Sequence, residues 1–231
     1  MGITGSIRNI LGLKPFVGFE ELSYRRLAEK KFQPDGIIDV GAYHGEWTRL
    51  ARKVFLDVPV FMIEAQDTKR PMLEKVCSDL PGVTYASALL GATTGEVVNF
   101  YEMETGSSFY AEQSNAPRST KKMCTETLSE VTKTFPGENL FLKIDVQGAE
   151  LQVLEGGADI LNRCEVVQLE VAMLPYNEGA PTMLQVLSYM DNCDFVPFDI
   201  SGESRPKGHL VQIDVLFTRR DSVLRPSFIN F

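Results

Sequence analysis

Residues 36–45 have the sequence Gly-Ile-Ile-Asp-Val-Gly-Ala-Tyr-His-Gly, and this stretch decides the fold class. The apolar run at 36–40 predicts a buried strand, and the glycines at 41 and 45 predict a tight loop. Residues 46–55 follow as a predicted helix, in which one apolar face carries Trp47, Leu50, Ala51, Val54 and Phe55. A strand that leads through a glycine loop into an amphipathic helix is typical of a parallel sheet covered by helices.

The same alternation of short apolar runs and helical periodicity continues to residue 218. Further strands are expected at 60–64, 83–89, 140–146, 166–171, 195–200 and 211–218. Right-handed crossovers between them give an α/β fold with a doubly wound, mostly parallel sheet of seven strands. The last two strands are close enough in sequence to form a hairpin, which makes the final strand antiparallel.

The length and composition suit one main globular unit. The chain has 231 residues, of which 44% are hydrophobic and 23% are charged. We expect an N-terminal helical extension at 1–34, the main domain at 35–220 and a C-terminal tail at 221–231. The polar segment 104–122 is expected to be a long loop that recognises a reaction partner, and simple mobility is the alternative reading.

The charge balance argues against a nucleic-acid partner. The chain carries 23 Lys and Arg against 31 Asp and Glu, a formal net charge of -8, so a general attraction to phosphate backbones is not expected. Apolar runs do not reach the roughly 18 residues that cross a bilayer, and the N-terminus lacks the apolar segment of a secretory signal. We therefore expect a soluble, cytoplasmic protein without membrane insertion.

Ligands of doubly wound sheets bind at the carboxyl ends of the strands, so residues in the following loops are candidates. Gly41 and Gly45 lack side chains and allow a ligand to approach backbone N–H groups. Ala42 and His44 share this loop, and Ser87 lies near the end of the third strand. Plain turn chemistry is the alternative explanation of the glycines, and solvent exposure is the alternative for His44.

Two acidic residues indicate which nucleoside this edge of the sheet would bind. The dinucleotide fingerprint needs glycines at positions where the chain has Tyr43 and Glu46. Asp39 would repel a pyrophosphate, whereas S-adenosylmethionine brings an ammonium and a sulfonium against one carboxylate. Glu64, at the end of the second strand, is expected to accept hydrogen bonds from two ribose hydroxyls. A helix cap for Asp39 and a solvated charge for Glu64 are the alternatives.

The chain resembles the FkbM-type methyltransferases in several stretches. They are residues 38–42 with Gly45 and Thr48, residues 142–150 (Leu-Lys-Ile-Asp-Val-Gln-Gly-Ala-Glu), residues 153–158, Glu170, and residues 176–181 and 212–217. The resemblance covers residues 35–220 and implies a Rossmann-like class I methyltransferase domain there. It also implies S-adenosyl-L-methionine as the cofactor and methyl transfer to a hydroxyl of a small molecule, sugar, glycolipid or natural product.

Two acids are the candidate catalytic residues. A hydroxyl is a poor nucleophile until its proton has an acceptor, and Asp145 should end the fourth strand beside the reacting methyl. Glu150 begins the next helix and is expected to bind substrate or act with Asp145. A structural strand-end acid and a favourable helix N-terminus are the respective alternatives. Asp145, Glu170 and a third oxygen would suit a divalent cation, but no dedicated metal spacing is present, so no metal is predicted.

Three functional hypotheses are therefore consistent with the sequence. An S-adenosylmethionine-dependent O-methyltransferase is favoured by the resemblance and by the acids at the strand ends. A non-catalytic nucleoside-binding module of the same fold would bind the cofactor without transferring a methyl group. An NAD-dependent oxidoreductase is the third candidate, and the missing glycines count against it.

Overall fold

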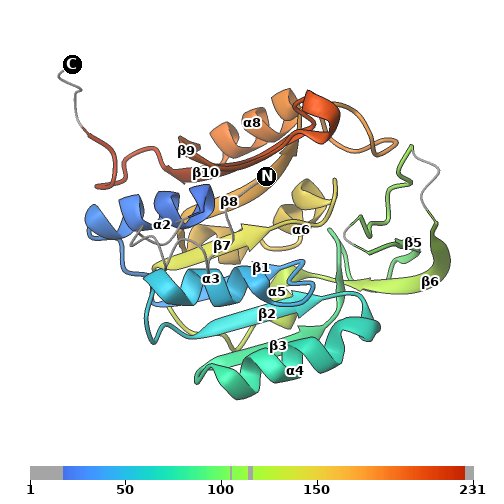
Figure 1. The fold of residues 1–231 in the computed structure, drawn as a ribbon, viewed down its shortest axis with the longest axis horizontal. Coiled ribbons are helices and arrows are strands. Elements are labelled where there is room, and N and C mark those ends of the chain that lie inside the picture. Colours follow the sequence, from blue (N-terminus) through green and yellow to red (C-terminus); the bar gives the residue numbers. More distant parts are fainter. Residues whose placement is uncertain (1–17, 105, 114–116, 227–231) are drawn as a thin grey trace, which may run out of the picture.

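The computed structural model describes residues 18–104, 106–113 and 117–226. Its central feature is a seven-stranded sheet with the strand order β3-β2-β1-β7-β8-β10-β9. The strands lie side by side through the centre of the molecule (Figure 1). The strands are β1 (Gly36–Val40), β2 (Val60–Glu64), β3 (Val83–Ser87), β7 (Leu140–Ile144), β8 (Cys164–Ala172), β9 (Phe195–Ser204) and β10 (Gln212–Arg219).

The strand directions confirm the predicted fold class. Neighbouring strands from β3 to β8 pair in parallel, whereas β10 pairs antiparallel with both β8 and β9. The sheet is therefore doubly wound and mostly parallel, and the final strand of the chain is the antiparallel one, inserted between β8 and β9. The carboxyl ends of β1, β2 and β7 consequently meet at one edge of the sheet.

Helices cover both faces of the sheet and create two separate cores. The first core contains side chains of α2 (Phe19–Glu29), α3 (Glu46–Val54) and α4 (Arg70–Asp79). The second contains side chains of α5 (Leu128–Val131), α6 (Glu150–Glu155), α7 (Ala158–Asn162) and α8 (Met183–Asn192). Strands buried on both faces need apolar residues in succession, which is why Ile37 and Ile38 are both fully buried. None of the described helices has the length and apolar character needed to cross a membrane.

Helix α2 packs into the first core rather than standing apart from the sheet. Tyr24 and Leu27 are fully buried, and the Tyr24 ring makes an edge contact with Phe141 of β7. The Trp47 indole N–H donates a hydrogen bond of 2.7 Å to the Tyr24 hydroxyl and so joins α3 to α2. Residues 1–17 and 227–231 lie outside the described residues, and the domain boundaries at 35 and 220 stay predictions.

A second, three-stranded sheet corrects one part of the sequence interpretation. It has the order β4-β6-β5, with β4 (Leu89–Leu90), β5 (Val97–Glu102) and β6 (Ser119–Glu126). The predicted loop 104–122 is too long, because residues 119–122 belong to β6 and pair antiparallel with β5. These residues are polar and mostly exposed, so they carry no apolar alternation that would have indicated a strand.

Candidate active site

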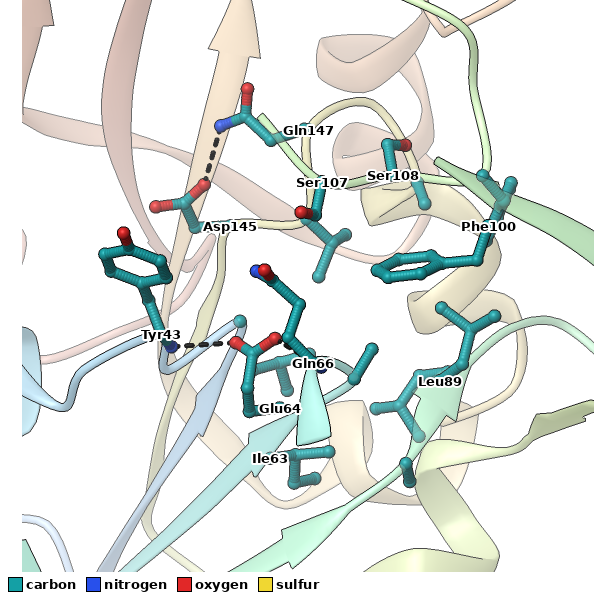
Figure 2. Close-up of a pocket in the computed structure, with 18 of the residues that line it drawn as sticks. Tyr43, Ile63, Glu64, Gln66, Leu89, Phe100, Ser107, Ser108, Asp145 and Gln147 are labelled. Atoms are coloured by element: carbon teal, nitrogen blue, oxygen red, sulfur yellow. Dashed lines mark hydrogen bonds between the residues drawn. The ribbon is translucent and has the colours of Figure 1, made fainter. Parts of the chain in front are cut away.

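A cavity of about 160 Å³ opens at the carboxyl ends of β1, β2 and β7. Figure 2 shows its polar side chains, Glu64, Gln66, Asp145 and Gln147, opposite the apolar side chains Leu89 and Phe100. The lining also includes Gly41, Tyr43, Ile63, Ala88, Leu90, Ser107, Ser108, Phe109 and Ala149. The strand ends therefore supply the polar groups, and the small sheet supplies part of the apolar wall.

The loop after β1 lies so close to the loop after β7 that it requires glycine. Gly41 has a φ of +73°, and a Cβ atom added there would lie 1.8 Å from the backbone oxygen of Asp145. Gly45 has a φ of +76°, and a Cβ atom there would lie 2.7 Å from Val76 Cγ2. Both positions thus combine a left-handed backbone with a close neighbour, and only Gly41 also lines the cavity.

Glu64 ends β2 and faces the cavity with both carboxylate oxygens already oriented. Its Oε2 accepts a 2.8 Å hydrogen bond from the Tyr43 backbone N–H, and its Oε1 accepts one of 2.8 Å from Gln66. Burial raises the pKa of Glu64, while these two backbone N–H groups and the Lys143 ammonium oppose the rise. Each oxygen keeps a further lone pair, so the carboxylate presents a two-point acceptor to the cavity.

Asp39 does not line the cavity. Its side chain is fully buried, where Oδ2 accepts a 2.7 Å hydrogen bond from the Thr48 hydroxyl and Oδ1 faces the Lys143 ammonium at 3.2 Å. The Lys143 ammonium also donates to the Gly41 oxygen at 2.9 Å. Burial disfavours the ammonium, but the carboxylates of Asp39 and Asp145 outweigh this and raise the pKa of Lys143. Asp39 therefore supports the loop from below.

Asp145 follows β7 and does line the cavity, with 37% of its side chain exposed. The Gln147 amide nitrogen donates to Asp145 Oδ1 at 3.1 Å and to both Glu170 oxygens at 2.9 Å. Glu170 also accepts from the Tyr176 hydroxyl at 3.0 Å and from the Gln212 amide. Burial first, and then Asp145 and Glu150, raise the pKa of Glu170. The Gln147 amide thus links the partly exposed carboxylate of Asp145 to the buried carboxylate of Glu170.

Glu150 points away from this cavity, although it begins α6 as expected. Its Oε1 accepts hydrogen bonds of 3.1 Å from the backbone N–H groups of Val146 and Gly148. Burial raises the pKa of Glu150 to about 7, against the opposing effect of those N–H groups. Glu150 therefore fixes the turn that carries Asp145 and Gln147, and it lines a second cavity on the far side of that turn.

The other predicted residues of the cofactor loop lie beside the cavity rather than in its lining. The Ala42 backbone N–H donates to the Ile63 oxygen at 3.2 Å, which joins the loop to β2. The His44 ring stacks on the Tyr43 ring, with 3.7 Å between the centroids, and its Nδ1 is 3.4 Å from a Glu46 oxygen. Ser87 is exposed at the end of β3, whereas its neighbours Ala88 and Leu89 line the cavity.

Several lining residues were not predicted as cofactor contacts. Gln66 follows Glu64 closely, and its position after a strand end could have indicated it. Phe100, Ser107 and Phe109 reach the cavity from β5 and the following loop. The polar loop 104–122 was predicted to contact the acceptor. Its residues Ser107 and Phe109 instead line the same cavity as Glu64, the predicted contact of the cofactor ribose. Among the described residues, no cluster of three or more His, Cys, Asp and Glu side chains is suited to hold a metal ion.

The strand order and strand directions of the large sheet are those of the class I methyltransferase fold, which the chain shares with a methyltransferase solved with S-adenosylhomocysteine. Within that class, the Methyltransferase FkbM domain matches residues 39–197, and the chain belongs to this family. The resemblance seen in the sequence is thus confirmed. No curated protein matches the chain in sequence at a significant level.

Solved structures share the fold at low sequence identity. A precorrin-6y C5,15-methyltransferase from Geobacter metallireducens GS-15 is 10% identical and has a TM-score of 0.50, with 87% of each chain covered. The 1,6-didemethyltoxoflavin-N1-methyltransferase of Burkholderia thailandensis, solved with S-adenosylhomocysteine, is 12% identical at a TM-score of 0.50, over 88% of this chain and 79% of that chain.

A third structure corrects the prediction about nucleic acid. An rRNA methylase from Streptococcus thermophilus is 11% identical at a TM-score of 0.50, over 89% of this chain and 98% of that chain. The prediction that nucleic acid is excluded as a partner is therefore wrong, because the same fold occurs in an enzyme named for an RNA substrate. Net charge averages over the whole surface, whereas recognition depends on the charge around the site.

Proposed function

We propose that the chain is an S-adenosylmethionine-dependent O-methyltransferase that acts on a hydroxyl of a small molecule. The observation that carries the proposal is Glu64, whose two oriented oxygens face a cavity beside the Gly41 turn. A carboxylate at the end of the second strand suits two adjacent ribose hydroxyls. The methyltransferase family of the chain favours this activity over the two competing functions.

The lining of the cavity suits an adenosyl group. Glu64 would accept hydrogen bonds from the ribose, and the Gly41 turn leaves backbone close to the ligand. Leu89 and Phe100, which lie on the apolar side of the cavity in Figure 2, would offer an apolar surface to the adenine. The bound cofactor supplies an electrophilic methyl group on a sulfonium. Asp39, Ala42, His44, Gly45 and Ser87 lie outside the cavity lining, and their proposed role is to support the loops around the cofactor.

Asp145 is the proposed general base for the acceptor hydroxyl. It is the partly exposed carboxylate of the cavity lining that follows β7, and Gln147 restrains its Oδ1 by a hydrogen bond of 3.1 Å. Its Oδ2 lies 3.7 Å from the Lys143 ammonium. Glu150 is proposed as a positioning residue, because it holds the turn that presents Asp145.

Calorimetry with S-adenosylhomocysteine and with NAD tests the cofactor. The proposal expects binding of the first and no heat with the second, and absence of binding to S-adenosylhomocysteine would overturn it. Methyl transfer from radiolabelled S-adenosylmethionine to a panel of hydroxylated small molecules tests the reaction. Asp145→Asn should keep cofactor affinity and lose turnover, and Asp57→Asn, at an exposed carboxyl, is the matched control. Cofactor binding without transfer to any hydroxyl would favour the binding module.

A further inference from the structure

A second cavity, of about 190 Å³, lies behind the turn that follows β7. It is lined by Gly148 and Glu150 of that turn and by the segment that connects β8 to α8. The two cavities share the 145–150 turn as a wall, because Asp145, Gln147 and Ala149 line the first and Gly148 and Glu150 line the second.

An unpartnered acceptor in the lining indicates what the second cavity would bind. Asn177 is only 5% exposed, and its side-chain nitrogen donates a 2.6 Å hydrogen bond to the Gln147 oxygen. Its Oδ1 is buried and has no hydrogen-bond partner within residues 18–104, 106–113 and 117–226. Buried polar atoms are normally paired, and an unpaired one costs free energy. A ligand that donates a hydrogen bond to Asn177 Oδ1 would remove that cost.

The charges of the lining define which ligands fit. Two carboxyl groups, those of Glu150 and Glu170, line the cavity, and no Lys, Arg or His side chain of the described residues does. Glu170 already accepts hydrogen bonds from Gln147, Tyr176 and Gln212. An anionic ligand would meet these acids without a counter-charge in the lining, whereas a hydroxyl or an ammonium would meet acceptors.

The opening of the cavity is apolar. Met173, Leu174 and Leu184 line it, and they are 37%, 47% and 75% exposed. Large apolar side chains that gather around a cavity opening are typical of a binding site. The ligand should therefore have an apolar body at this opening and a polar donor toward the 145–150 turn.

The second cavity is connected to the proposed catalytic base. Gln147 contacts Asp145 of the first cavity at 3.1 Å and Glu170 of the second at 2.9 Å. A polar group bound near Glu170 would thus be linked to Asp145, the proposed proton acceptor, through the side-chain amide of Gln147.

We infer that the second cavity binds the non-reacting part of the methyl acceptor, and that this part has an apolar body and a neutral or cationic hydrogen-bond donor rather than an anionic group. The reacting hydroxyl would extend past the 145–150 turn to Asp145 in the first cavity. This inference rests on the proposed function. The apolar body would pack between β8 and α8, and the donor would pair with Asn177 Oδ1.

Three probes with the same six-carbon body separate these requirements: hexan-1-ol, hexan-1-amine and hexanoate. They are titrated into the full chain labelled with ¹³C at the methionine methyl groups, in the presence of saturating S-adenosylhomocysteine. Met173 and Met183 line the cavity and report binding there, and the remaining methionines are internal controls. The alcohol and the amine should shift both signals, and hexanoate should bind about tenfold more weakly or not at all.

Two variants tie the signal to this cavity. Ala172→Phe fills it and should abolish the response to hexan-1-ol. Leu184→Glu changes an exposed rim residue, so it should fold normally and weaken the binding of hexan-1-ol about threefold to tenfold. Val223→Glu, at a residue that is 93% exposed and outside the lining, is its matched control and should change nothing. The affinity for S-adenosylhomocysteine should stay within about twofold in all three variants.

The outcomes separate this inference from the proposed function. Failure of the unmodified chain to bind S-adenosylhomocysteine would overturn the proposed function itself. If that ligand binds but hexan-1-ol and hexan-1-amine leave Met173 and Met183 unshifted, the inference alone is overturned. It is also overturned if hexanoate binds as tightly as the other probes, or if S-adenosylhomocysteine displaces them.

Discussion

Lys143 and Asp39 form a buried ion pair beneath the loop that follows β1, with 3.2 Å between Nζ and Oδ1. Their side chains are 5% and 0% exposed. The ammonium also donates to the backbone oxygens of Val40 and Gly41, so a single side chain ties β7 to the end of β1. The charge of Asp39 is thus compensated within the protein, beneath the cavity lining.

Lys143→Met should lower the free energy of unfolding by about 3–5 kcal/mol. The substitution leaves the Asp39 carboxylate buried without its counter-charge, and removal of one partner of a buried pair has this magnitude of effect. Urea denaturation measures the change. The double variant Asp39→Asn with Lys143→Met should recover part of the loss, because the orphaned charge is then removed. A single variant as stable as the original chain would contradict the role assigned to the pair.

Gly41→Ala should destabilise the chain far more than Gly95→Ala. Both glycines have a positive φ, +73° and +86°, but a Cβ atom at 41 meets the Asp145 oxygen at 1.8 Å and one at 95 meets nothing within 4 Å. We expect a loss of about 1 kcal/mol at 95 from backbone strain alone, and at least about 3 kcal/mol or failure to fold at 41. Thermal unfolding of both variants compares their stabilities directly. Equal losses of stability would mean that the backbone shifts to relieve the contact between a Cβ atom at 41 and the Asp145 oxygen.

Glu64→Ala should weaken binding of S-adenosylhomocysteine about 100-fold to 10,000-fold. The variant removes two acceptors for the ribose hydroxyls, and hydrogen bonds to a charged group contribute about 1.5–3 kcal/mol each. Glu64→Gln keeps one oxygen and should lose less. Calorimetry gives both affinities, and Glu29→Gln, at an exposed position of α2, is the control. Unchanged affinity in Glu64→Ala would place the ligand elsewhere.

Glu150→Gln should flatten part of the pH dependence of stability. Burial raises the pKa of the Glu150 carboxyl in the folded state from 4.5 to about 7. The folded state therefore holds this proton more tightly, so the contribution to stability is complete below pH 4.5 and is lost as the pH rises through about 7.

The measurement is urea denaturation of both proteins between pH 4.5 and 8. The variant keeps an oxygen for the Val146 and Gly148 N–H groups, so at pH 8 it should equal or exceed the original chain in stability. Its advantage should shrink as the pH falls. A constant difference across this range would show that Glu150 does not titrate there.

Much of the fold and part of the site could be predicted from local patterns. The strand-end positions of Gly41, Glu64 and Asp145 follow from where apolar runs stop, and all three line the first cavity. Asp39 and Glu150 sit at equally suggestive positions, yet neither lines the first cavity: Asp39 pairs with Lys143, and Glu150 accepts from backbone N–H groups beside the second cavity. Sequence position alone does not distinguish an acid that faces a cavity from one that faces a buried lysine or a backbone turn.

The sequence by itself determined the α/β fold and the glycine loop, because the periodicity of apolar residues and the need for a positive φ are local properties. Only the tertiary structure decided the partners of the charges. The register between β1 and β7 places Asp39 opposite Lys143, and β5 with its following loop closes the first cavity with Phe100 and Phe109. Contacts between distant segments depend on how strands align and pack, which no short stretch of sequence encodes.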